Sequence, residues 1–137
     1  MRHIPLFDRI PDWEQVVRGL VVPSVFGILT GLVLNWNELA YLIMAGPIGI
    51  GGGFFAGYEH RGTEQGALRG VVGGLLFGSF ILLGNELAGA DPEAHLPSPQ
   101  ILLVVITAGL GAALGAVGGR LRAKRPEPAR APEPGAP

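Results

Sequence analysis

The chain has 137 residues, of which 48% are hydrophobic and 15% are charged, with a formal net charge of −1 and no cysteine. The lack of cysteine excludes disulfides, thiol metal ligands and thiol nucleophiles, and we expect no nucleic-acid partner. The apolar residues are gathered into blocks rather than spaced along amphipathic helices, which indicates membrane spans.

Four of these blocks are long enough to cross a bilayer. At a rise of 1.5 Å per residue, 18 to 20 residues extend roughly 27–30 Å, close to the thickness of a hydrocarbon core. We expect spans at residues 19–36, 39–58, 67–84 and 101–119. The third is the weakest, because Arg69 lies within it and would have to extend towards the headgroups. The sequence therefore predicts an all-α membrane protein with four transmembrane helices.

The placement of basic residues supports this prediction independently. All ten lysines and arginines precede the first span, flank the loop between the second and third spans, or follow the fourth span. The other two connections, residues 35–38 and 85–100, carry acidic charges only. Because basic residues accumulate on the cytoplasmic side, we expect a multi-pass protein of the plasma membrane with both termini in the cytoplasm.

The segments that flank the membrane domain, residues 19–119, have distinct compositions. Residues 1–18 mix charges with two prolines, so we expect a cytoplasmic segment in which the first helix begins near the headgroups. Asn35 and Glu38 predict a capping box for the second helix. Residues 120–137 are basic and then proline-rich, which predicts a disordered cytoplasmic tail. Four of its five basic residues are expected to attract lipid headgroups: Arg120, Arg122, Lys124 and Arg125.

An internal repeat relates the two halves of the membrane domain. The sequence Asn-Glu-Leu-Ala occurs at residues 37–40 and again at residues 85–88. The second predicted span of each half also has three glycines spaced by four. Since each unit would contain two spans, the copies would be related by a pseudo-two-fold axis along the membrane normal. We expect a duplicated two-helix hairpin, with chance similarity between glycine-rich spans as the alternative.

Glycine is concentrated in the predicted spans rather than in the loops. Helices associate in a bilayer by close packing, and small residues spaced by four let two backbones approach. We therefore expect stripes of glycine to form the helix contacts. The predicted contact residues are Gly27, Gly31, Gly49, Gly53, Gly57, Gly70, Gly74, Gly78, Gly111, Gly115 and Gly119.

The segment GIGGGFFAG, residues 49–57, allows two other interpretations. It contains a G-x-G-x-x-A pattern typical of dinucleotide binding, but no acidic residue lies about twenty residues on, and another span follows. It could also belong to a broken helix that lines a solute site, since Pro47 precedes it and Pro23 interrupts the first span. Whether these prolines line a cavity or adjust the packing stays open.

No catalytic, cofactor-binding or metal-binding constellation is found in the sequence, so we expect no enzyme. The spans hold four hydroxyl residues that can bond to their own helix backbone: Ser24, Thr30, Ser79 and Thr107. His3, His60 and His95 are scattered, and we expect them to be solvated in loops.

Residues 51–74 resemble small prokaryotic four-span membrane proteins of unknown function. One shared feature is Gly-Gly-x-x-Ala-Gly-Tyr at the end of a span, and the other is Gly-Ala-x-x-Gly-x-x-Gly-Gly at the start of the next. The matching residues are Gly52, Gly53, Ala56, Gly57, Tyr58, Gly66, Ala67, Gly70, Gly73 and Gly74. The resemblance covers under a fifth of the chain and implies no functional residues.

Two hypotheses follow. The first is a structural or accessory membrane protein, a glycine-packed bundle that forms a homo-oligomer or serves as a small subunit of a larger membrane-protein complex. The second is a small channel or facilitator for a small neutral solute. Membrane lipid is the one partner expected in either case.

Overall fold

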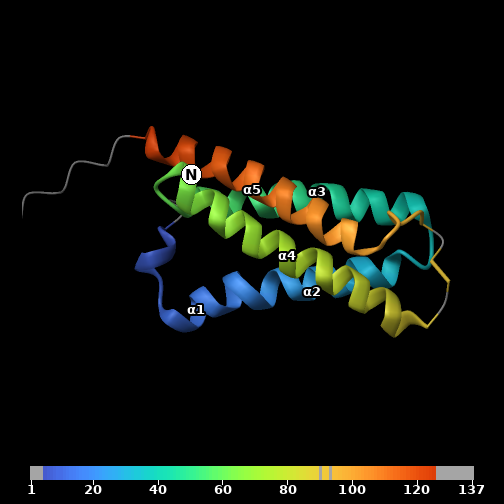
Figure 1. Cartoon of the computed structure of the whole chain (residues 1–137). Coiled ribbons are helices and arrows are strands. Elements are labelled where there is room, and N and C mark those ends of the chain that lie inside the picture. Colours follow the sequence, from blue (N-terminus) through green and yellow to red (C-terminus); the bar gives the residue numbers. More distant parts are fainter. Residues whose placement is uncertain (1–4, 90, 93, 126–137) are drawn as a thin grey trace, which may run out of the picture.

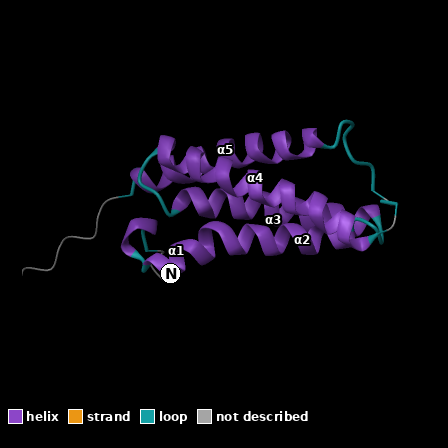
Figure 2. Ribbon diagram, turned by 60° about the horizontal axis from the view of Figure 1, so that its bottom comes forward, coloured by secondary structure: helices purple, strands orange, loops and turns teal. Residues whose placement is uncertain are grey.

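The computed structural model describes residues 5–89, 91–92 and 94–125, and this part of the chain contains helices and no strands. A short 3-10 turn, Phe7–Arg9, precedes a bundle of four antiparallel helical segments (Figures 1 and 2). The first segment is made of α1 (Asp12–Val16), a π-helical turn (Val17–Val21) and α2 (Val22–Val33). The others are α3 (Glu38–Tyr58), α4 (Thr63–Ala88) and α5 (Ile101–Ala123).

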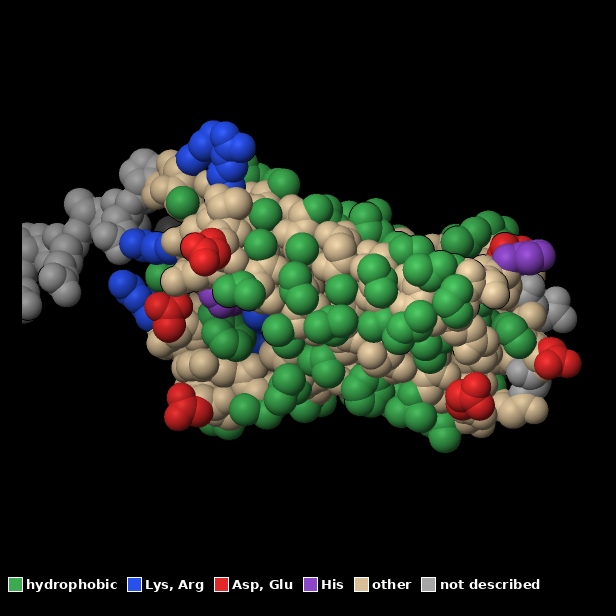
Figure 3. All heavy atoms as spheres, viewed as in Figure 1, with side chains coloured by type: hydrophobic (Ala, Val, Ile, Leu, Met, Phe, Trp, Pro, Cys, Tyr) green, Lys and Arg blue, Asp and Glu red, His purple; other side chains and the backbone are tan. Residues whose placement is uncertain are grey.

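Each of the four segments is long and apolar enough to cross a membrane. Each contains an 18-residue stretch of high mean hydropathy, 2.0 in Asp12–Val33, 1.6 in α3, 1.8 in α4 and 2.3 in α5. Many large apolar side chains are exposed between the two ends of the bundle, which Figure 3 shows as a belt of green atoms. An apolar exterior is what a bilayer requires of a spanning helix.

The fourth helix organises the bundle. It packs along α5 and along α2, and it also contacts α3, while α3 packs mainly on α5 (Figure 1). By contrast, α2 and α3 are joined by a short turn but touch each other much less. The extensive hairpin is therefore α4–α5, and the helices of the first half are distributed on either side of it.

The turn between α2 and α3 differs from the prediction. Asn37, not Asn35, caps α3, because its side-chain oxygen accepts hydrogen bonds from the backbone N–H groups of Leu39 at 2.8 Å and Ala40 at 3.2 Å. Asn35 is turned towards α4. The predicted first span also ends earlier, since α2 stops at Val33.

The two Asn-Glu-Leu-Ala sequences occupy different structural positions. Residues 37–40 cap and begin α3, whereas residues 85–88 form the last turn of α4. That turn ends at Gly89, whose φ of 65° lies in the left-handed region that glycine adopts most easily. The following loop packs back on the bundle, and the Ala94 N–H donates to the Leu34 carbonyl at 3.3 Å.

A cluster of buried apolar side chains lies towards the end of the bundle that carries the α2–α3 turn and the loop after α4. We call this the acidic end, because these two connections carry acidic charges only. The cluster consists of Leu34, Tyr41, Phe77, Ile81, Ala94 and Leu103. Glycines occupy many of the other positions between the helices, from Gly31 and Gly84 near the acidic end to Gly66 and Gly119 near the opposite, basic end.

Candidate functional site: interhelical glycines and a polar cluster at the basic end

The contact between α4 and α5 leaves no room for side chains at a row of glycines. A Cβ atom on Gly70 would overlap the Gly111 carbonyl, and one on Gly111 would overlap the Gly70 carbonyl. At Gly74 a Cβ would lie 2.7 Å from the Thr107 carbonyl carbon. Real Cβ atoms essentially never come within 3.0 Å of such atoms. Gly78, Gly115 and Gly119 are enclosed in the same way.

The contacts of α2 and α3 use the remaining predicted glycines. On α2, a Cβ at Gly27 would lie 2.7 Å from the Phe77 carbonyl oxygen, and one at Gly31 would lie 2.9 Å from Gly84 Cα. On α3, a Cβ at Gly57 would lie 2.6 Å from the Gly115 carbonyl carbon. Two predicted positions have more room. A Cβ added at Gly53 would lie 3.3 Å from Leu114 Cβ, and one added at Gly49 would make only an ordinary contact of 3.6 Å with the Phe77 ring.

Three further glycines are equally enclosed but were not among the predicted residues. Gly66 lies against Gly115 and Gly119, Gly84 against Ile28, and Gly118 against Phe54 and Tyr58. Gly66 lies before the predicted start of the third span. Gly84 and Gly118 do not continue the four-residue spacing of their stripes, so only their burial in the fold identifies them.

Four span glycines have the opposite environment. At Gly46, Gly51, Gly52 and Gly109, an added Cβ would meet nothing within 4 Å. Three of these four positions are on α3, whose span is the least buried of the four. The GIGGGFFAG segment therefore has two sides, with Gly53 and Gly57 turned towards α5 and Gly51 and Gly52 open.

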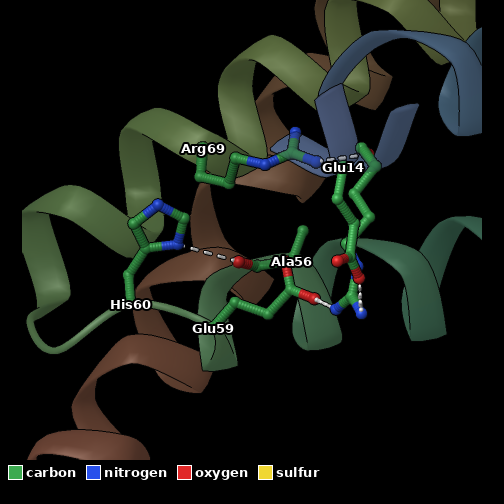
Figure 4. Close-up of polar contacts among 6 residues, drawn as sticks. Glu14, Ala56, Glu59, His60 and Arg69 are labelled. Atoms are coloured by element: carbon green, nitrogen blue, oxygen red, sulfur yellow. Dashed lines mark hydrogen bonds and ion pairs between the residues drawn. The ribbon is translucent and has the colours of Figure 1, made fainter. Parts of the chain in front are cut away.

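At the basic end, Arg69 lies half-buried between α4 and the π-helical turn. Its Nη2 donates to the Arg18 carbonyl at 2.7 Å and its Nη1 to the Gly19 carbonyl at 3.5 Å (Figure 4). These carbonyls need a donor, because Val22 bonds five residues back to Val17, and the next residue, Pro23, has no N–H to give to Arg18 or Gly19. The position of Pro23 therefore explains why a side chain of α4 donates to these two carbonyls.

Arg18 joins the ends of two helical segments. Its guanidinium donates to Glu14 Oε1 and to Glu59 Oε1, both at 2.6 Å. Phe7 lies next to this group. Its N–H donates to the Glu59 carbonyl at 2.9 Å, and the Arg69 guanidinium lies 5.5 Å from its ring centre.

His60 is part of the same cluster and is not simply solvated. Its ring stacks on Phe7 with 5.1 Å between centroids, and its Nδ1 lies 3.1 Å from the Ala56 carbonyl. His95, in contrast, is exposed, and His3 lies outside the described residues. Among the hydroxyl residues, the expected bonds to the helix backbone are confirmed for Ser24, Thr30 and Thr107.

The predicted headgroup residues lie at the end of α5, which continues beyond Gly119 to Ala123. The guanidiniums of Arg122 and Arg125 lie 5.3 and 5.4 Å from the ring centre of Tyr58, which is only 8% exposed. Arg120 and Lys124 are exposed. Residues 126–137 of the predicted tail lie outside the described residues.

The two prolines have different surroundings. Pro23 is the second residue after the π-helical turn, in the first turn of α2, which accounts for an irregularity in the first span. Pro47 is exposed inside α3, and that helix continues without a break from Glu38 to Tyr58.

Between α2 and α4, at the acidic end, Asn35 Nδ2 donates to Asn85 Oδ1 at 3.1 Å, and Asn85 is only 6% exposed.

We expect the replacement of Asn85 by alanine to lower the free energy of unfolding by about 1 kcal/mol, because the interhelical amide bond is lost and Asn35 keeps only its longer bond of 3.4 Å to the Gly31 carbonyl. The replacement of exposed Glu86 by alanine is the control, with a change below about 0.5 kcal/mol. Thermal unfolding in detergent, followed by circular dichroism, measures both. Equal unfolding midpoints for the two variants would show that the amide pair does not stabilise the bundle.

The comparisons with known proteins add no assignment. No family model matches the chain, and no curated protein or solved structure matches it. The class is defined by the fold alone. Four candidate membrane-spanning helices indicate a multi-pass membrane protein.

Proposed function

We propose that this chain is a structural or accessory protein of the plasma membrane, which associates with itself or with a larger membrane-protein complex. Its open glycines support the proposal most directly. Glycine in a helix costs about 1 kcal/mol relative to alanine, and Gly46, Gly51 and Gly52 touch nothing within the chain that would require it. A second helix packed on α3 would give these positions the close backbone contact that small residues allow.

The enclosed glycines support the other part of the proposal, a bundle packed through glycine stripes. Between Gly66 and Gly78 on α4, every fourth residue lies against α5 with no room for a Cβ. A backbone contact of this length gives dispersion energy along both helices without large side chains to order. The same residue type would then have two uses, contact within the chain on α4 and α5 and contact between chains on α3.

The orientation proposed from charge is supported by where the helix ends lie. Basic residues gather at one end of the molecule in Figure 3, the end at which α1 and α4 begin and α3 and α5 finish. By the preference of lysine and arginine for the cytoplasmic side, this end and both termini would be cytoplasmic.

We also retain the duplication as a proposal from the sequence. The glycines at 49, 53 and 57 and at 111, 115 and 119 support it, because both rows are on the second helix of their half. The unequal contacts α2–α3 and α4–α5 and the different positions of the Asn-Glu-Leu-Ala copies imply that the halves would have diverged in packing.

The proposed association is tested by replacing Gly52 with isoleucine. We expect the mass of the complex extracted in mild detergent to fall to that of one chain in its micelle, because the β-branched side chain keeps a neighbouring helix away. The matched control is Gly109→Ile, an open glycine on α5, which should leave the mass unchanged. If the wild-type protein is already a single chain, the proposal is wrong. A co-purifying larger protein lost only in the Gly52 variant would support the accessory-subunit form.

A channel or facilitator for a small neutral solute ranks second. The observation that favours it is the exposed Pro47 beside open glycines on α3, since an assembly of several chains could bring these positions around a path. It ranks lower because α3 is continuous through Pro47. Solute flux in liposomes that is lost with Gly52→Ile would move it to first place.

A further inference from the structure

A pocket of about 590 Å³ opens between the first helical segment and α4 at the basic end. Val16, Gly19 and Leu20 line one side, and Leu68, Arg69 and Val72 line the other. We call it the lateral groove. In Figure 3 a purple and a blue patch are recessed between green side chains near the basic end of the visible face. It is a shallow groove that is open along most of its length rather than an enclosed cavity.

The groove exists because of two residues. Gly19 has no side chain to fill it, and a Cβ there would make only an ordinary contact of 3.7 Å with the Phe7 ring. Arg69 connects the two walls through its bonds to the Arg18 and Gly19 carbonyls. The π-helical turn and its supporting arginine thus leave a gap beside α4 that the chain itself does not fill.

The chemistry of the groove changes along its length. Leu20 and Leu68 are 49% and 62% exposed, so these apolar walls face the bilayer. The polar residues Asp12, Gln15 and Gln65 line the groove as well, at the ends of the helical segments where headgroups would lie. A site that is apolar along one part and polar at the membrane surface fits an amphipathic ligand.

The occupant must also suit the two charged residues of the groove, Arg69 beside the apolar walls and Asp12 at the polar end. Arg69 is the one lysine or arginine among the residues that line the groove. Its Nη1 makes a single long bond of 3.5 Å, so the guanidinium has donor capacity left. A phosphodiester provides the acceptors that arginine binds best, whereas an apolar helix of a second protein would add none.

We propose that the lateral groove binds one phospholipid molecule. One acyl chain lies between the apolar walls formed by Val16, Leu20, Leu68 and Val72, and the phosphate accepts a hydrogen bond from Arg69. This site is separate from the basic residues at the end of α5 and from the open glycines of α3. It would fix one lipid beside the helix junction that Arg69 stabilises.

The test is a titration of the purified, delipidated protein with dioleoylphosphatidylglycerol in detergent, with bound lipid counted by mass spectrometry of the intact protein. We expect one tightly bound lipid for the wild type and about tenfold weaker binding for Gly19→Leu, which fills the groove. Gly109→Leu, at an open glycine on α5, is the matched control and should bind as the wild type does. Dioleoylglycerol, which has the same chains and no phosphate, should bind more weakly to the wild type.

Two further variants keep the test decisive if Gly19→Leu does not fold. Gly19→Ala adds a smaller group and should weaken binding less, and Val72→Trp fills the groove from its other wall. Equal lipid affinity in the wild type and in every groove-filling variant that folds would overturn the proposal. A loss of chain association with no loss of lipid would also overturn it, because the occupant would then be a second copy of this protein.

Discussion

Replacing Gly70 with valine is expected to separate α4 from α5 and to lower the free energy of unfolding by about 3 kcal/mol or more. A Cβ at this position would overlap the Gly111 carbonyl, so the helices cannot keep their distance and the whole row of backbone contacts is affected. We expect this loss of stability to exceed that caused by one overpacked side chain in a part of a core that can adjust to it. Thermal unfolding in detergent, followed by circular dichroism, measures the change.

The matched control for this prediction is Gly109→Val. Gly109 is only two residues from Gly111 on the same helix, and nothing lies within 4 Å of its missing side chain. The loss or gain of helix propensity is the same in both variants, so the difference between them reports the contact alone. If Gly70→Val and Gly109→Val unfold at the same temperature, the glycines are not what brings α4 and α5 together.

The second large effect is expected at Arg69. Replacing it with methionine should lower the free energy of unfolding by about 2–3 kcal/mol, because the Arg18 and Gly19 carbonyls lose a charged donor. In a Pro23→Ala background the same replacement should cost at least about 1 kcal/mol less. Alanine restores the backbone N–H at residue 23, which can then donate to one of these carbonyls.

A double-mutant cycle measures this coupling, and the chain offers a control proline. Arg69→Met combined with Pro47→Ala should give additive changes within about 0.5 kcal/mol, since Pro47 is on α3 and exposed. Equal coupling of Arg69 to Pro23 and to Pro47 would mean that the arginine does not compensate for the missing N–H. Additivity in both cycles would lead to the same conclusion.

Composition and charge were enough to predict the four apolar helices, because a bilayer demands about twenty apolar residues wherever the chain crosses it. The four-residue spacing was also informative for α4, where Gly70, Gly74 and Gly78 all lie against α5. The spacing could not show that Gly51 and Gly52 are open while Gly53 and Gly57 are not. That distinction depends on which side of α3 is turned towards α5.

The polar cluster at the basic end was harder to predict. Arg69 made the third predicted span the weakest of the four, since a charge in lipid is normally drawn to the headgroups. Its true partners are backbone carbonyls fifty residues earlier in the chain, and they lack donors only because Pro23 follows a π-helical turn. A proline in one apolar span and an arginine in another could have suggested this pairing. Their proximity required the packing of the first segment on α4.

The lack of cysteine makes one measurement especially direct. In membranes that contain Gly52→Cys as the sole cysteine, mild oxidation should produce a disulfide-linked species through α3, seen by non-reducing electrophoresis. Ser79→Cys, exposed on α4, is the control and should remain a single chain. A dimer that forms through residue 52 and not through residue 79 is the result expected from self-association on α3. If residue 52 forms no crosslinked species, self-association through α3 is contradicted.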